Sequence, residues 1–141
     1  MANKTRQSAN LVSGSNIYSD TINNRVGIAI TTPSTTLQVA GTITCTDINS
    51  TSDIKLKENI HSINNPLEKV MQINGVGFRW KDTKEDALGV IAQDIEEVFP
   101  ELVRQNEHIK TVNYNGLIGV LIEAVKEQQR QIEELKKHIN I

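Results

Sequence analysis

The chain has 141 residues, enough for one or two small domains, and a formal net charge of −2 that does not favour broad binding to nucleic acid or membranes. Aromatic residues make up only 4% of the chain, which is little for the core of a self-sufficient monomer. Small cores of this kind often gain stability by oligomerising, so self-association is expected from composition alone.

The sequence gives no sign of a targeting segment, a membrane span or a metal site. Residues 1–10 lack the apolar stretch of a signal peptide, and the longest apolar runs are too short to cross a bilayer. Synthesis in the cytoplasm is therefore the default expectation. The one cysteine, Cys45, cannot form an intrachain disulfide, and no Cys/His spacing resembles a zinc site. We expect Cys45 to pack as a small apolar residue.

The N-terminal third is rich in Thr, Ser and Asn and is predicted to form β-structure. Residues 1–20 are polar and lack a period, which predicts a loop. Residues 25–48 are predicted to form short strands, because residues such as Val26 and Ile28 alternate with small residues and turn signals follow. Strands this small bury little in one chain, so we expect them to pack against identical neighbours. Residues 47–53 are predicted to be a linker.

A small mixed domain is predicted after the linker. Its proline residues mark where helices begin and end, and alternating apolar residues mark its strands. The expected elements are a short strand at 54–60, a helix beginning at Pro66, a strand at 75–81, a strand at 88–91, a helix at 93–98 that ends before Pro100, and a closing hairpin that includes Val103 and residues 110–112.

A strict seven-residue repeat follows from Tyr114 onward and predicts a coiled coil. A helix of about 26 residues would extend roughly 40 Å. The narrow apolar stripe favours self-association, and the alternative is an amphipathic helix docked on its own domain. Gln128, the polar position in the stripe, can fix the register or the number of chains. The predicted seam consists of Ile118, Leu121, Val125, Gln128, Ile132, Leu135 and Ile139.

Ser52 and Lys57 form a candidate catalytic pair at the junction between the two parts of the chain. A lysine can act as the base for a serine hydroxyl only when neutral, which requires desolvation or nearby positive charge. In a regular strand, positions 52 and 57 face opposite ways. A pair within one chain would therefore need a turn, whereas a pair between chains would not. Alternatively, the segment is a capped turn before an exposed strand, on which Asp53 and Glu58 pair with Lys55 and Lys57.

Three segments, taken in order, point to a known family. Residues 52–60 (SDIKLKENI) are similar to its Ser-Asp-x-Arg/Lys-x-Lys start, and residues 89–103 (GVIAQDIEEVFPELV) resemble its most recognisable stretch. Residues 112–135 resemble its long terminal helix, and residues 25–43 resemble the fibre segment that commonly precedes it. The chain thus resembles the C-terminal intramolecular chaperone domain of endosialidase-type phage tailspikes, tail fibres and neck appendages. A related module occurs in some eukaryotic membrane-bound transcription factors.

The resemblance implies an α+β fold with three parts. Residues 1–50 would be the end of a β-structured trimeric fibre segment, and residues 51–113 the α+β body of the chaperone domain. Residues 114–141 would form the helix of a trimeric coiled coil. The implied function is an intramolecular chaperone that trimerises and registers a viral tail fibre or spike and then releases itself by autoproteolysis.

The resemblance also assigns roles to the residues at the junction. Ser52 would be the nucleophile and Lys57 the base of a peptidase that acts once, within a chain or between subunits, with Asp53 and Glu58 as reserve candidates. The family pattern places the scissile bond at Ser52–Asp53. Attack of Ser52 on its own carbonyl would need a strained four-membered ring, whereas an N-to-O acyl shift would break Thr51–Ser52. Both bonds stay open at this point.

The expected partners are two further copies of the chain, upstream fibre or spike domains of the same chain, and a host surface receptor. Neither nucleic acid nor membrane is expected, and no cofactor or metal is implied. The expected location is the virion tail fibre or spike, after synthesis in the host cytoplasm, where the released domain would remain. The alternatives are an uncleaved trimeric fibre tip that attaches to the host and a plain coiled-coil oligomerisation module without chemistry.

Overall fold

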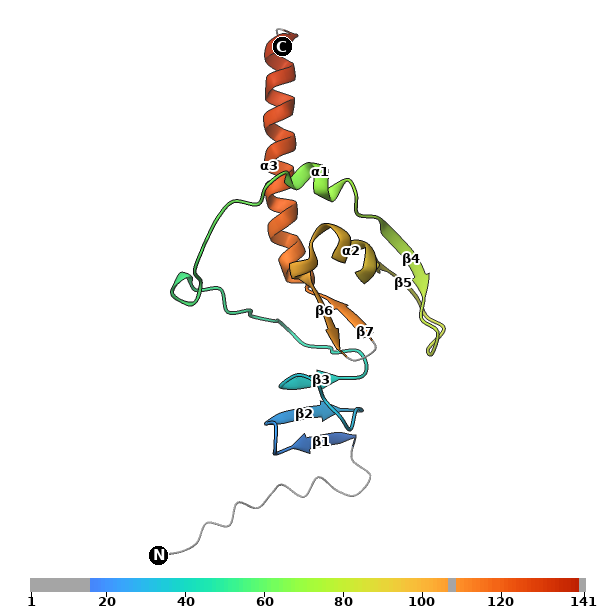
Figure 1. The fold of residues 1–141 in the computed structure, drawn as a ribbon. Helices are drawn as coiled ribbons and strands as arrows, with labels where there is room; N and C mark the ends of the chain where they lie inside the picture. The colour runs from blue at the N-terminus through green and yellow to red at the C-terminus, as the bar shows by residue number, and fades with distance from the viewer. Residues whose placement is uncertain (1–15, 107–108, 140–141) are drawn as a thin grey trace, which may run out of the picture. The chain divides into compact units, whose positions relative to one another are not determined.

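A computed structural model of the chain describes residues 16–106 and 109–139. These residues belong to two compact units, Met1–Leu56 and Lys57–Ile141. Small sheets occur in both units and a long helix in the second, so the predicted α+β class is confirmed (Figure 1). The part of the N-terminal loop predicted over residues 1–15 lies outside the described residues. The three-part division predicted from the sequence stays a prediction.

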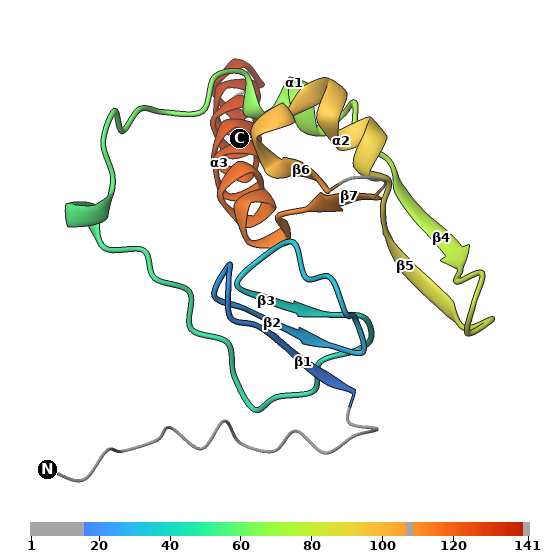
Figure 2. The ribbon, with the colours of Figure 1, turned by 60° about the horizontal axis from the view of Figure 1, so that its bottom comes forward.

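The first unit contains a three-stranded sheet, shown with its strands side by side in Figure 2. The strands are β1 (Ile17–Asp20), β2 (Arg25–Ile28) and β3 (Leu37–Val39). β2 pairs with β1 in antiparallel and with β3 in parallel orientation. The strands predicted within residues 25–48 are confirmed, whereas the loop predicted over residues 17–20 is wrong.

β1 was missed because four residues with a single aliphatic side chain carry too little alternation to indicate a strand. Its stability comes instead from pairing along β2, in which Ile17 lies opposite Ile28. The strand ends at Asp20, whose carboxylate accepts hydrogen bonds from the backbone amides of Ile22 (3.1 Å) and Asn23 (3.0 Å) and so closes the turn into β2.

The last residues of the first unit form a short 3₁₀ helix, η1 (Ile54–Leu56), in place of the strand predicted at 54–60. The side chain of Asp53 explains the difference, because its carboxylate accepts a hydrogen bond from the amide of Lys55 at 2.9 Å and its carbonyl accepts one from Leu56 at 3.1 Å. Residues 41–62 are all exposed. The prediction that Cys45 packs as an apolar residue is therefore wrong, since no apolar layer covers it.

The second unit begins with a short helix and ends with a long one. Its elements are α1 (Pro66–Val70), β4 (Gly75–Arg79), β5 (Asp86–Val90), α2 (Ala92–Val98), η2 (Pro100–Leu102), β6 (Val103–Asn106), β7 (Ile109–Val112) and α3 (Tyr114–His138). β4–β5 and β6–β7 are antiparallel hairpins, and the first of them extends away from α3 (Figure 1). The helix predicted at Pro66, the helix ended by Pro100 and the closing hairpin are confirmed.

The core of the second unit is small and is centred on α2. Ile95 and Phe99 lie one helical turn apart and are completely buried, and Leu102 and Val120 complete the cluster. The partly buried residues around it are Ile63, Val70, Ile73, Val90, Val98, Val103, Val112 and Leu117. A core built on so few large side chains agrees with the low aromatic content of the sequence.

Leu102 fixes where α3 begins. Its carbonyl accepts a hydrogen bond from the amide of Asn113 at 2.8 Å, and the Asn113 side chain then caps α3 by accepting one from the amide of Gly116 at 3.2 Å. A Cβ atom at Gly116 would overlap the Leu102 side chain. Glycine at this position therefore lets the backbone of α3 pack closely against Leu102, and it is not needed for a special backbone angle. The core thereby determines the position of the helix that carries the predicted seam.

Candidate assembly surface and cleavage segment

The long helix α3 has two faces with opposite roles. Val120 and Ala124 are 4% and 3% exposed and belong to the side that packs on the domain. Ile118 and Val125, on the neighbouring side, are 56% and 61% exposed. The helix therefore docks on its own domain, as one of the two interpretations of the sequence expects. It also leaves an apolar stripe exposed to solvent, which the other interpretation, self-association, requires.

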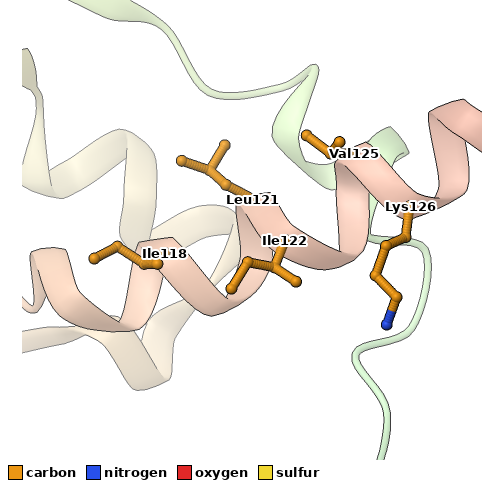
Figure 3. Close-up of a pocket in the computed structure, with 5 residues that line it drawn as sticks. All are labelled: Ile118, Leu121, Ile122, Val125 and Lys126. Carbon is orange, nitrogen blue, oxygen red and sulfur yellow. The ribbon is translucent and has the colours of Figure 1, made fainter.

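The predicted seam lies entirely on this open stripe. The 25 residues of α3 begin at Tyr114, as the heptad count predicted. Every seam residue is exposed on the single chain, from Ile118 through Gln128 to Ile139. The N-terminal half of the stripe forms a shallow groove, whose five lining side chains all come from α3, as Figure 3 shows. They are Ile118, Leu121, Ile122, Val125 and Lys126.

Ile122 widens the stripe beyond the predicted positions. It is 53% exposed and follows Leu121 directly, so it lies beside the seam rather than on it. The sequence signal was present, since the same heptad position is occupied by the polar residues Gln129 and Lys136 in the two following heptads. In a coiled coil such a position contacts the flank of the neighbouring helix.

The segment that contains the predicted catalytic pair is open to solvent. Ser52, Asp53, Lys57 and Glu58 are all exposed, with η1 between the first two and the last two. Ser52 falls in the first unit and Lys57 in the second. Residues 52 and 57 would face opposite ways in a regular strand, but residues 52–58 form no strand. The roles of these residues stay predictions.

The carboxyl groups whose pKa is lowered, those of Asp20 and Asp86, belong to other segments of the chain. The side chain of Asn23 hydrogen-bonds the Asp20 carboxylate and, with two backbone amides, holds the pKa of Asp20 below its ordinary value. On the β4–β5 hairpin, the guanidinium of Arg79 lowers the pKa of Asp86, and this carboxylate raises the pKa of Arg79. Both pairs are exposed and close turns or strand ends, so their role is local structure.

Residues 52–104 match the family described as chaperone of endosialidase. The chain carries an endosialidase-type chaperone domain. The family match starts at Ser52, so it includes the predicted pair as well as the buried residues Ile95, Phe99 and Leu102. It ends within β6, before α3 begins.

Curated relatives of the chain include proteins of phage tails. The long tail fiber protein Gp37 of Salmonella phage S16 is 32% identical over 111 residues, which are 70% of this chain and 15% of the relative. Gp37 of Enterobacteria phage K3 is 36% identical over 98 residues, or 62% of this chain and 8% of the relative. Myelin gene regulatory factor-like A of Dictyostelium discoideum is 26% identical over 148 residues, or 88% of this chain and 16% of the relative. The chain thus spans a small part of these relatives.

Two further observations concern the chaperone domain within residues 16–106 and 109–139. No cluster of His, Cys, Asp or Glu in these ranges is placed to hold a metal ion. Across the same ranges, no helix has the length and apolar character needed to span a membrane.

Proposed function

We propose that this chaperone domain forms a homotrimer through α3 and thereby assembles the bacteriophage tail fibre of which it is part. The observation that carries the proposal is the exposed apolar seam on a helix whose other face is already committed to the domain core. A contiguous apolar stripe of this kind marks an interaction site. The similarity to Gp37 proteins supports a tail fibre as the structure being assembled.

Trimerisation through a helix solves a kinetic problem for the β-structured fibre. Interchain β pairing depends on contacts between distant residues and forms slowly. A coiled coil forms from locally folded helices, and once formed it raises the effective concentration of the attached β segments. The strands β1–β3 precede the domain in the same chain and would be registered in this way.

We include in the proposal a single self-cleavage beside Ser52. Ser52 supplies the hydroxyl and Lys57 the base, with Asp53 and Glu58 as reserve candidates. Lys57 is exposed on the single chain, so the desolvation that a lysine base needs would come from neighbouring copies. Cleavage after assembly would remove the trimeric chaperone domain that nucleated the fibre. The remaining fibre would then unfold only slowly, because the unfolded chains could not reassemble, and it would be kinetically stable.

The bond to be cut is either Ser52–Asp53, as the family pattern indicates, or Thr51–Ser52. In the second case the Ser52 Oγ attacks the carbonyl carbon of Thr51 and Lys57 takes the hydroxyl proton. The Thr51–Ser52 amide bond breaks as Lys57 passes this proton to the Ser52 nitrogen, which gives an ester and a free amino group on Ser52. Water then hydrolyses the ester, which leaves the carboxylate of Thr51.

Self-cleavage is tested by denaturing electrophoresis and mass spectrometry of the purified full chain. Wild type should give two fragments, whose masses identify the bond, and Ser52→Ala and Lys57→Ala should each give one intact chain. A wild-type chain that stays intact after long incubation contradicts the peptidase role. If that intact chain is still a trimer, the alternative of an uncleaved fibre tip for host attachment replaces it.

Trimerisation is tested by sedimentation of the same chain. Ser52→Ala should sediment as a trimer, and Val125→Asp should sediment as a monomer because it places a carboxylate in the seam. Arg130→Asp is the matched control, since Arg130 is exposed on the side of α3 away from the seam. A monomeric or dimeric parent chain would contradict the chaperone mechanism.

A further inference from the structure

Two asparagine residues of the chain are followed directly by glycine, Asn74 before Gly75 and Asn115 before Gly116. In such a pair the backbone nitrogen of the glycine can attack the side-chain carbonyl carbon of the asparagine, because glycine has no Cβ atom to hinder the approach. The attack requires that this nitrogen loses its hydrogen and that the backbone around it can rearrange. The structure meets these requirements at one pair and opposes them at the other.

The backbone amide of Gly75 points away from the strand with which β4 pairs. The amide of Trp80 donates a hydrogen bond to the carbonyl of Glu85 at 3.0 Å, at the loop end of the β4–β5 hairpin. Hydrogen-bonded and non-hydrogen-bonded pairs alternate along an antiparallel ladder. Gly75 and Val90, five positions along from that bond, are therefore a non-hydrogen-bonded pair. The N–H of Gly75 is directed toward the other edge of β4, which no strand among the described residues covers.

The backbone around Asn74 is also unconstrained by packing. Asn74 lies in the connection between α1 and β4, outside any helix or strand, and both Asn74 and Gly75 are exposed. A Cβ atom at Gly75 would meet nothing within 4 Å, so no neighbouring group holds this part of the backbone in place. The asparagine side chain and the glycine nitrogen are therefore free to approach each other.

The second pair is held by the fold. The amide of Gly116 donates to the carbonyl of Asn113 at 3.1 Å and to the side-chain oxygen of the same residue at 3.2 Å. Asn115 lies in the first turn of α3, and the backbone at Gly116 packs closely on Leu102. Removing the amide hydrogen of Gly116 therefore requires that the start of α3 first opens.

We propose that Asn74 is a site of spontaneous modification, whereas the fold protects Asn115. Hydroxide takes the proton of the Gly75 amide, and the nitrogen bonds to Cγ of Asn74. The side-chain nitrogen takes a proton from water and leaves as ammonia, which gives a cyclic imide. Water then opens the ring. Addition at Cγ leaves aspartate, and addition at the backbone carbonyl carbon leaves isoaspartate, in which the main chain runs through Cγ.

The products would change the joint between the core and the β4–β5 hairpin. Asn74 follows Ile73, which packs against the core, and precedes the first residue of β4. Both products place a carboxylate at this joint, and isoaspartate also lengthens the main chain by one carbon. The adjacent pair, Val76 and Gly89, is expected to exchange its amide hydrogens faster in the modified chain, because the end of the hairpin is held less firmly.

The proposal is tested on the full chain with Ser52→Ala, which stays intact whether or not wild type cleaves itself. The chain is incubated at mildly alkaline pH in heavy-oxygen water, and both asparagines are followed by peptide mass mapping. Asn74 should take up heavy oxygen and yield both aspartate and isoaspartate, at least about tenfold faster than Asn115. An unmodified Asn74, or an Asn115 that reacts as fast, would overturn the proposal.

Gly75→Ala is the matched variant for the attacking nitrogen. Its methyl group enters open space, so the fold should be kept, but the Cβ atom hinders the attack and the reaction at Asn74 should slow at least about tenfold. A variant that reacts as fast as the parent would contradict attack by this nitrogen.

Unfolding the same chain in urea tests whether the structure causes the difference between the two asparagines. In urea the hydrogen bonds of Gly116 are lost, so Asn115 should react about as fast as Asn74. A difference that persists in urea would show that neighbouring residues, and not the fold, protect Asn115, and this part of the proposal would be wrong.

Discussion

The carboxylate of Glu127 accepts a hydrogen bond from the backbone amide of Leu67 at 3.1 Å, so that a side chain of α3 caps the first turn of α1. The residue before α1, Asn65, makes no capping hydrogen bond with its own side chain. A carboxylate near a helix N-terminus also interacts favourably with the helix dipole. The contact joins residues 60 positions apart and holds α1 against the helix that carries the seam.

Glu127→Ala is predicted to lower the free energy of unfolding by about 0.5–2 kcal/mol, because it removes this cap. The matched control is Glu123→Ala, one turn earlier on the same helix, which removes a surface ion pair with Lys126 worth about 0.2–0.5 kcal/mol. Urea unfolding at one fixed chain concentration measures both. Equal losses in the two variants would show that the cap contributes nothing beyond a surface charge.

Two glycines of α3 are predicted to respond in opposite directions to alanine. Gly116→Ala should destabilise the domain by about 1–3 kcal/mol, because the added methyl group would overlap the Leu102 side chain in the core. Gly119→Ala adds its methyl group in open space and should stabilise the helix by about 0.5–1 kcal/mol. Thermal unfolding of both variants checks the sign. A stabilised Gly116→Ala protein would mean that Leu102 does not fix the start of α3.

The Arg79–Asp86 pair is predicted to make the β4–β5 hairpin sensitive to acid. The guanidinium donates to both carboxylate oxygens, at 2.7 and 2.9 Å, and holds the pKa of Asp86 below its ordinary value of 3.8. A lowered folded-state pKa means that the contact contributes stability above the unfolded-state pKa. This contribution is lost as the pH falls through the folded-state value. An NMR titration should find the lowered value in wild type and a return toward 3.8 in Arg79→Gln. Identical titration curves would refute the pairing.

Ala29 is predicted to be a site where glycine stabilises the first unit. Its φ of 55° lies in the left-handed region, which costs an L-residue about 1–2 kcal/mol. Ala29→Gly removes this strain and adds back about 0.4–1 kcal/mol of unfolded-state entropy, so the net gain should be about 0.5–1 kcal/mol. Asn24→Gly is the control, because asparagine tolerates its φ of 54° well. Hydrogen exchange within β2 measures both, and a loss in Ala29→Gly would contradict the strain.

Features that depend on local sequence could be predicted. The heptad residues after Tyr114 indicated a long helix, and Pro66 and Pro100 marked helix boundaries, because these signals act within a few residues. The residues of the predicted seam are exposed on that helix, and their role as a seam stays a prediction. Each of these predictions required knowledge of one element and its own periodicity.

Features that depend on distant partners could not be predicted. β1 exists through its pairing with β2, and the Glu127 cap joins two helices that are far apart in the sequence. The strand expected at 54–60 failed for a different reason, since the apolar alternation of Ile54 and Leu56 was overridden by hydrogen bonds to Asp53. Alternation alone does not reveal whether a sheet is available to receive the strand.

The last three turns of α3 have a consequence for how assembly can be observed. Residues 128–139 are all exposed, so in a lone chain these turns have little tertiary packing to support them. Short helices without such packing are marginal in water. Their helical content is therefore expected to rise with chain concentration as copies associate. The far-ultraviolet circular dichroism of a dilution series would then report the fraction of chains that have associated.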